Sequence, residues 1–308
     1  MSPGLDQKGR LMMSHSRTRR LLALLAAVAA TLSLAAGCGG REAQTGQEAK
    51  QINIGYIAWD EDIAVTYLYK ELLERRGYAV KATELEAGPI YAGLAQGNPD
   101  LFLDGWLPAT HEDYWKQYGP QLEDLGVWYD QATLNIAVPN YMTDVNSIAD
   151  LKGKGAELGG TVTGIDPGAG LSRTTKEALP AYGLQGEFTL QTSSTTAMLA
   201  ALQKATDERK PIVVTLWHPH WAYARYPIKD LQDPLGAMGA AEQIHAIGRK
   251  GFSQDFPEVT DMVKKFKLTD QQLASLENEI NSAAKGQEQA AAKKWADANP
   301  EVIRSFAG

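Results

Sequence analysis

The sequence has very little cysteine: one residue, Cys38, in 308. An intramolecular disulfide is therefore impossible, and the fold has to rest on a buried apolar core. Hydrophobic residues make up 44% of the chain and charged residues 22%, which is an ordinary globular composition. The length allows two units that each have a core.

Motifs for catalysis and for nucleotide binding are also missing. The sequence contains no Walker-type glycine loop and no repeat of fixed period. Ser172 lies in GLSRT, which is not a nucleophile elbow, and no second cysteine could serve as a nucleophile. We therefore expect a protein without enzymatic activity and without a cofactor. A structural or adhesive protein is a further alternative, and a change in tryptophan fluorescence on ligand addition would separate it from a binding protein.

The N-terminal region has the pattern of an export signal. Three arginines (Arg17, Arg19, Arg20) precede the apolar run LLALLAAVAATLSLAAG, which ends at Cys38. LAAGC resembles a bacterial lipobox, although Ala35 stands where a branched residue is usual. We expect residues 1–38 to be a lipoprotein signal peptide, with Met1, Met12 or Met13 as the start. The alternative is a signal peptide cut nearby without lipidation.

If Cys38 is lipidated, the mature protein is extracytoplasmic and held at the cell membrane by its lipid. Residues 1–38 carry five basic side chains and one acidic one, and the whole chain has a net charge of −7, so the remainder carries −11. Such an acidic body is poorly suited to nucleic acid or to anionic lipid surfaces. Residues 39–50, GGREAQTGQEAK, contain few apolar side chains and predict a flexible tether.

The body alternates strand-like and helix-like segments. INIGYIAW predicts a strand, and a helix should follow with Asp60 or Asp62 as N-cap and Gly77 as its end. Later segments repeat this order, which favours an α/β fold with mostly parallel sheets covered by helices. We expect two lobes: lobe A from residues 51–136 and 247–308, and lobe B from residues 137–246.

Three tryptophans follow short apolar runs. Trp59 stands in AWDED, Trp106 in DGWLPATH and Trp217 in LWHPHW. The glycine and proline beside Trp106 predict a loop at the end of a strand. Ligands of open α/β sheets collect at the carboxyl ends of strands, so the three rings should converge if both lobes face one cleft. Indole faces attract cations, whereas core packing is the alternative for any single tryptophan.

Two other features could bind an anion. In GIDPGAGLS, a helix should start near Leu171 or Ser172 and leave the N–H groups of Gly170 and Leu171 free, although a glycine turn capped by Ser172 is the alternative. His111 can donate to a carboxylate, or it can be a surface or capping histidine. The tryptophans could bind a cation and these donors could bind a carboxylate, so together they predict a site for a zwitterion.

Several blocks of the body carry a family resemblance. IGYIAWDED, EAGPIYAGLAQG, WLPATHEDYW, GIDPGAGLS, WHPHWAYARY and IHAIGRKGF resemble the substrate-binding proteins of glycine betaine and proline betaine ABC importers. The resemblance covers about Ile52 to Phe252. It implies a two-lobed type II periplasmic-binding fold that closes on its ligand and delivers it to a permease and ATPase complex.

The same resemblance assigns roles to residues. It implies that Trp59, Trp106 and Trp217 form a prism around the trimethylammonium group, and that Gly170 N–H, Leu171 N–H and His111 take the carboxylate. Betaine, choline and carnitine share the cation, so the preferred ligand stays open. Glu61 could accept a hydrogen bond from the hydroxyl of choline, which would favour choline instead.

A metal-binding lipoprotein is the weakest of the alternatives. HPH at 218–220 offers two histidines, His218 and His220, without a third ligand at fixed spacing, so we expect no metal site. We favour the interpretation that the histidines of this motif lie beneath Trp217 and support it. The run Asp60, Glu61, Asp62 is similarly interpreted as a helix N-terminus, where negative charge is favourable.

Overall fold

The computed structural model describes residues 50–308. Cys38, the signal peptide and all but the last residue of the tether lie outside the described residues. Residues 50–308 lie within one compact unit.

Within residues 50–308, nine strands form two sheets that are joined through one shared strand. The strands are β1 (Gln51–Tyr56), β2 (Ala79–Glu84), β3 (Leu101–Leu107), β4 (Leu122–Pro139), β5 (Thr161–Thr163), β6 (Thr189–Gln191), β7 (Val214–His218), β8 (Ile228–Asp230) and β9 (Glu242–Arg249). Their order is β2-β1-β3-β9-β4-β7-β5-β6, with β8 also paired to β4. The strands β2, β1 and β3 run parallel, as do β6, β5 and β7. The strands β4, β8 and β9 pair antiparallel with their neighbours, so the sheets are mixed rather than mostly parallel.

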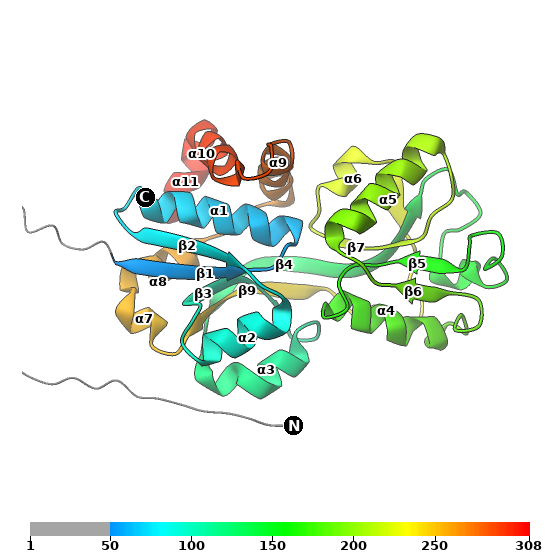
Figure 1. The fold of residues 1–308 in the computed structure, drawn as a ribbon, viewed down its shortest axis with the longest axis horizontal. Helices are drawn as coiled ribbons and strands as arrows, with labels where there is room; N and C mark the ends of the chain where they lie inside the picture. The colour runs from blue at the N-terminus through cyan, green and yellow to red at the C-terminus, as the bar shows by residue number, and fades with distance from the viewer. Residues whose placement is uncertain (1–49) are drawn as a thin grey trace, which may run out of the picture. The chain divides into compact units, whose positions relative to one another are not determined.

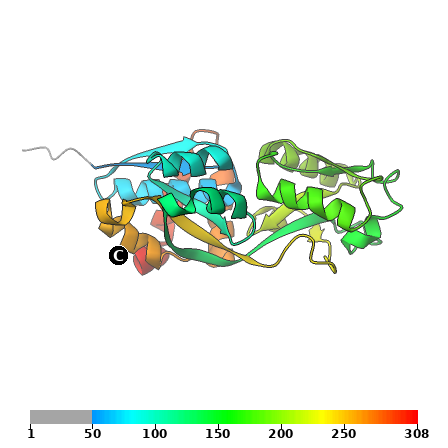
Figure 2. The same ribbon diagram turned by 90° about the horizontal axis from the view of Figure 1, so that it is seen from below.

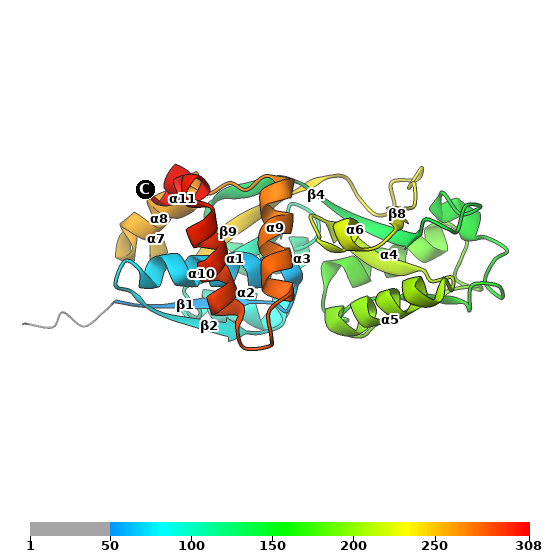
Figure 3. The same ribbon diagram turned by 90° about the horizontal axis from the view of Figure 1, so that it is seen from above.

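In lobe A, helices cover both faces of the sheet formed by β2, β1, β3, β9 and the first part of β4. Helix α1 (Asp60–Glu74) lies on one face, and α2 (Ala87–Ala95) and α3 (Glu112–Tyr118) lie on the other (Figure 1). The C-terminal helices belong to the same lobe: α7 (Phe252–Asp255), α8 (Pro257–Lys265), α9 (Asp270–Asn281), α10 (Glu288–Ala298) and α11 (Pro300–Ala307). Helices α9 and α10 pack on α1 (Figure 3).

In lobe B, helices again lie on both sides of the sheet. Helix α4 (Gly170–Ala181) lies on one side, and α5 (Thr195–Glu208) and the short α6 (Ala222–Arg225) lie on the other (Figure 1). Two 3₁₀ turns complete the fold: η1 (Gly119–Gln121) in lobe A and η2 (Ile148–Leu151) in lobe B.

Strand β4 connects the two sheets. Its residues from Leu122 to Ala132 pair with β9, and those from Thr133 to Ala137 pair with β7. Strand β4 therefore passes from one sheet to the other at residue 133. This is three residues before residue 136, where the first predicted segment of lobe A ends. The whole of β9 pairs with β3 and β4, so the predicted boundary at 246/247 falls inside a lobe A strand. Seen from below, β4 and the segment leading into β9 lie along the same edge of the body (Figure 2).

Two predicted helix starts need correction. Helix α1 begins at Asp60, and its N-cap is Trp59 rather than Asp60 or Asp62. The Asp62 carboxylate instead accepts the backbone N–H of Ile57 at 2.7 Å, in the turn before the helix. Helix α4 begins one residue earlier than expected, at Gly170, with Ala169 as N-cap. Ser172 is not a cap, because its hydroxyl donates to the carbonyl of Asp166 at 2.7 Å.

Candidate ligand-binding site

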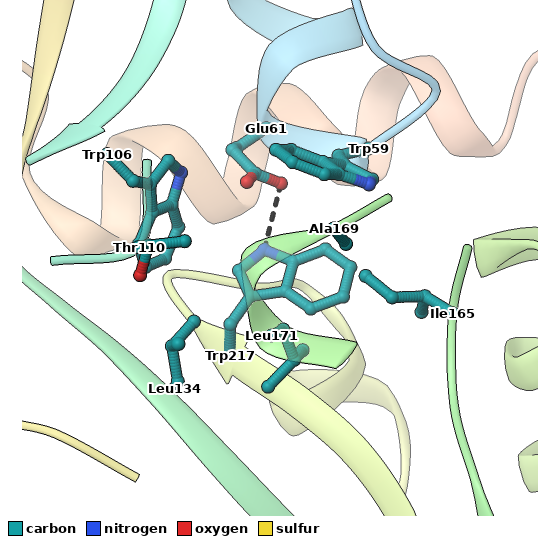
Figure 4. A pocket seen from close by; sticks show the side chains of 9 residues that line it. All are labelled: Trp59, Glu61, Trp106, Thr110, Leu134, Ile165, Ala169, Leu171 and Trp217. Atoms are coloured by element: carbon teal, nitrogen blue, oxygen red, sulfur yellow. Dashed lines mark hydrogen bonds between the residues drawn. The ribbon is translucent and has the colours of Figure 1, made fainter. Parts of the chain in front are cut away.

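Residues from both lobes line a pocket that contains all three predicted tryptophans (Figure 4). About 250 Å³ of space, part of it open to solvent, lies between the lining side chains. The lining residues are Trp59, Glu61, Trp106 and Thr110 from lobe A, and Leu134, Ile165, Ala169, Leu171 and Trp217 from β4 and lobe B.

Trp106 lies inside β3 rather than on the loop predicted for it. It pairs with Ile244 of β9, next to an irregularity of the β3–β9 register between Phe102 and Gly105. Gly105 permits this pairing, because a Cβ there would lie 2.3 Å from the Ile247 side chain. The strand ends one residue later, before Pro108, so Trp106 still stands at its carboxyl end.

Each pocket tryptophan donates its indole N–H to a carboxylate. Trp59 donates to Asp166 at 3.1 Å, and Trp106 donates to Asp104 at 3.1 Å. Trp217 donates to Glu61 at 2.9 Å, and Figure 4 shows this bond beside the three rings. These bonds satisfy the only polar group of each indole, and they orient the rings. The ring faces are then free to line the pocket.

The first turn of α4 offers backbone donors at the pocket. Leu171 lines the pocket, and Gly170 stands between it and Ala169, which also lines it. Within residues 50–308, no protein group accepts the N–H of Gly170 or of Leu171. The first N–H groups of a helix have no partner inside the helix, and the helix dipole adds positive potential there. This end of the pocket is suited to an anion.

His111 lies next to the pocket and is completely buried. Its Nδ1 accepts the backbone N–H of Trp106 at 3.0 Å and lies 3.1 Å from the hydroxyl of Tyr91. Burial, with the charge of Arg173 added, lowers the pKa of His111 to about 3, so the ring is neutral near pH 7. A neutral ring whose Nδ1 accepts must carry its proton on Nε2, and among the described residues Nε2 has no acceptor.

The imidazole of His111 also stacks on Trp59, with 5.8 Å between the ring centroids. Hence a neutral N–H donor stands beside the indole cage. His111 itself is not among the lining residues.

The loop between β3 and α3 is fixed from several sides. Glu242 accepts the backbone N–H groups of Ala109 at 2.7 Å and Thr110 at 2.8 Å. Arg173 of α4 donates to the carbonyl of Ala109 at 3.1 Å, across the two lobes. Residue 170 has to be glycine at this contact, since a Cβ there would lie 2.4 Å from the carbonyl oxygen of Thr110. These contacts hold His111 and Thr110 against the start of α4.

Sequence patterns did not mark four lining residues: Thr110, Leu134, Ile165 and Ala169. Thr110 and Ala169 directly precede predicted site residues, and this adjacency is the signal that could have found them. Leu134 lies in a strand and Ile165 lies close to one, and both are apolar. The sequence around such a residue does not show whether it lines a pocket or lies in the core.

Buried carboxyl groups gather behind the tryptophans. Asp104 and Glu61 are both completely buried. Burial raises the pKa of Asp104 to about 8, although the bond from Trp106 acts against this. Burial also raises the pKa of Glu61 well above its usual value, and the nearby Asp104 and Glu277 raise it further. The cage therefore has protonatable groups behind it.

The HPH motif supports the pocket from one side. His220 is buried and packs edge-on against Trp217, with 4.6 Å between the ring centroids. His218 instead lies 2.7 Å from Asp230 and stacks on Tyr223. In the part of the chain that the structure describes, no three His, Cys, Asp or Glu side chains are grouped as metal ligands. None of the helices formed by residues 50–308 is long and apolar enough to cross a bilayer.

Comparison with known families gives one match over most of the chain. Residues 50–298 match the family described as the substrate binding domain of the ABC-type glycine betaine transport system. A curated relative is the glycine betaine/carnitine transport binding protein GbuC of Listeria monocytogenes, which is 40% identical over 156 residues. That alignment covers 50% of this chain and 51% of GbuC, about half the length of each.

Solved structures extend the likeness to the whole body. The glycine betaine/L-proline-binding protein ProX of Borrelia burgdorferi has a TM-score of 0.78 and 32% identity, over 83% of this chain and 96% of its own. Lactococcal OpuAC, closed and complexed with glycine betaine, has a TM-score of 0.75 and 33% identity, over 83% of this chain and 99% of its own. The predicted two-lobed α/β fold is confirmed by these likenesses.

Proposed function

Because this chain belongs to the family of substrate-binding domains of ABC-type glycine betaine transport systems, we propose that its pocket captures glycine betaine or a closely related quaternary ammonium zwitterion. Proteins of this family bind a substrate and do not convert it, in agreement with the lack of catalytic motifs. The captured solute is then delivered to the permease and ATPase of an ABC importer.

The observation that carries this proposal is the pairing of two unlike surfaces in one pocket. Trp59, Trp106 and Trp217 contribute ring faces, and the first turn of α4 contributes free N–H groups. A quaternary ammonium has no N–H to donate, so an aromatic cage suits it better than carboxylates alone. Backbone N–H groups at a helix start suit a carboxylate. A small molecule with both groups matches both surfaces.

In this mechanism each residue has one task. The indole faces surround the methylated nitrogen, and the N–H groups of Gly170 and Leu171 donate to the ligand carboxylate. His111 donates to the same carboxylate through Nε2–H, because its Nδ1 is already occupied by Trp106 N–H. His111 is neutral near pH 7, so its hydrogen bond to the carboxylate does not depend on a proton that is lost near neutral pH.

A choline-binding or carnitine-binding protein of the same fold is the second candidate. Glu61 favours it, because this residue lines the pocket and its Oε1 has no hydrogen-bond partner among the described residues. A hydroxyl on the ligand could donate to that oxygen. The name of the Listeria relative also includes carnitine.

Localisation is proposed from the N-terminal pattern together with the family. A binding protein of an ABC importer works outside the cytoplasm, and the LAAGC pattern would add a lipid on Cys38. The tether of residues 39–50 would then let the body reach the permease while the lipid stays in the membrane.

A calorimetric comparison of glycine betaine with choline tests the choice of ligand. Choline lacks the carboxylate and leaves the pocket donors unpaired, at about 1–3 kcal/mol for each group, so it should bind at least about tenfold more weakly. His111→Ala should narrow this gap, because it weakens betaine more than choline. Equal affinities of wild type for the two ligands, with His111→Ala indifferent to both, would refute the carboxylate assignment even if the cage is right.

A further inference from the structure

Glu61 is a carboxylate in the wall of an otherwise aromatic and apolar pocket. It is the second residue of α1, and its carboxyl group points between the three indoles (Figure 4). One oxygen, Oε2, accepts the indole N–H of Trp217 at 2.9 Å. The other, Oε1, is buried and has no hydrogen-bond partner within residues 50–308. A buried carboxylate oxygen without a donor is costly, unless a ligand completes it.

The groups around Glu61 do not supply a positive charge to balance its carboxylate. Asp104 on β3 and Glu277 on α9 are the titratable groups whose charges act on it, and both are acidic and buried. The Trp217 indole donates a hydrogen bond to Glu61 but carries no full charge. The N-terminal end of α1 adds only a partial positive charge. None of these groups carries a full positive charge. A cation that enters the pocket would therefore supply one beside Glu61.

We propose that Glu61 is a specificity-determining residue of the pocket, whose free Oε1 faces the ammonium group and raises the affinity for net-cationic ligands relative to zwitterions. This inference rests on the proposed function, since it requires the ammonium group to lie among the three tryptophans. It differs from a purely aromatic cage, whose attraction depends on the ring faces and not on a neighbouring carboxylate.

The selectivity follows from the distance dependence of Coulomb interactions. A carboxylate attracts an ammonium at short range and repels the ligand carboxylate, which lies farther away. In glycine betaine one carbon separates the two charged groups, so attraction and repulsion partly cancel. In choline nothing cancels the attraction. Glu61 therefore helps choline more than betaine, while the donors at α4 help only betaine.

Glu61→Gln is the direct test, because glutamine keeps the size of the side chain and an oxygen that can accept from Trp217. Removing the charge should lower choline affinity about tenfold and betaine affinity less than about threefold. Calorimetric titration of both ligands gives the ratio. A rise in the preference for betaine over choline of about threefold or more supports the inference.

Asp166→Asn is the matched control. Asp166 also accepts an indole N–H of a pocket tryptophan, Trp59, but it is not among the residues that line the pocket. This variant should change the affinities for the two ligands by the same factor. If Glu61→Gln does the same, or has no effect, Glu61 only positions Trp217 and the inference is overturned. If wild type binds neither ligand, the proposed function itself fails and the inference with it.

Proton release by the wild-type protein tests the same idea without a variant. A cation beside Glu61 favours its ionised form, whereas burial, Asp104 and Glu277 favour the protonated form. Choline binding should release protons, and betaine should release fewer, as measured by calorimetry near pH 7 in two buffers of different ionisation enthalpy. Equal proton release for the two ligands contradicts the inference.

Discussion

At the scale of single residues, each pocket tryptophan uses two parts of its ring. The N–H edge of Trp59, Trp106 or Trp217 donates to a carboxylate, and the ring contributes to the pocket wall. The edge bond holds the ring at one angle, which limits the conformational freedom that ligand binding would otherwise remove. A carboxyl group therefore stands at the N–H edge of each ring.

Substitution of the cage residues should weaken binding without unfolding the protein. Trp59→Ala, Trp106→Ala or Trp217→Ala should each lose about 0.5–2 kcal/mol of cation–π attraction, roughly 2- to 30-fold in the Kd for glycine betaine. The corresponding Trp→Phe changes should cost less, because they keep an aromatic face. Trp115→Phe is the control, since Trp115 does not line the pocket. Unchanged affinity in two of the three alanine variants, measured by calorimetry, would remove the cage.

The polar groups behind the rings were harder to predict than the rings. The convergence of the three tryptophans was expected from their positions after apolar runs. The run Asp60, Glu61, Asp62 predicted a helix N-terminus, and all three residues do lie in the first turn of α1. Local pattern could not show that Glu61 reaches Trp217, which is 156 residues away along the chain. Such pairings depend on how two lobes meet.

At the scale of secondary-structure elements, the first turn of α4 matters most. It supplies free N–H groups, and it also touches the β3–α3 loop of the other lobe. Tyr114 of α3 donates to the carbonyl of Gly168 at 3.1 Å, and Arg173 donates to that of Ala109. The residue at 170 has no room for a side chain at this contact. Ligand donors and the contact between lobes therefore lie on the same helical turn.

Gly170→Ala should separate binding from folding. The added Cβ would lie 2.4 Å from Thr110 O only when the lobes are together, so overpacking of about 1–3 kcal/mol should lower betaine affinity roughly 5- to 150-fold. The Tm of the ligand-free protein should stay the same or rise slightly, because alanine favours a helix. Gly186→Ala is the matched control, with no atom within 4 Å of its Cβ. Full affinity in Gly170→Ala would contradict this packing.

Element boundaries show where sequence reasoning stops. The strand β1 and the helix α4 were expected close to where they lie. Trp106 was expected on a loop, because glycine and proline flank it, yet β3 continues through it. Its pairing partner Ile244 is far along the chain, and the pairing with β9 continues the strand through Trp106. Local propensity cannot anticipate a ladder whose second strand is remote.

At the scale of the whole molecule, side-chain hydrogen bonds hold the two lobes together. Three indoles donate across the cleft, Trp59 to Asp166, Trp217 to Glu61 and Trp221 to Asp60. Asp60 also accepts from Asn281 of α9. Most of these groups belong to the pocket or touch its walls. These contacts stabilise the closed form, and a ligand that touches both lobes only in that form shifts the population further toward it.

Closure should be visible in solution. Small-angle scattering of the protein with saturating glycine betaine should give a smaller radius of gyration than scattering without ligand. The reason is that the ligand contacts both lobes only when they are together. Glycine, which lacks the methylated ammonium, is the control. An unchanged radius at saturation would count against a binding site that opens and closes.

The proposed membrane attachment can be tested on the full chain. If Cys38 carries the lipid, Cys38→Ala should move the protein from the membrane fraction to the soluble fraction of cells, because the lipid would be its anchor. Immunoblots of the two fractions measure this. Arg41→Ala, a change in the predicted tether, is the control and should leave the protein in the membrane fraction. Persistent attachment of Cys38→Ala would point to an uncleaved signal helix.

The long strand β4 has a consequence for how this protein can be divided. Its first part completes the lobe A sheet beside β9, and its last residues pair with β7 and β8 in lobe B. A cut on either side of β4 would leave one sheet with an unpaired edge of backbone N–H and C=O groups. The two halves are therefore not interchangeable modules. A chimera with a related protein has to take β4 from the same parent as both of its neighbours, or rebuild one of its two edges.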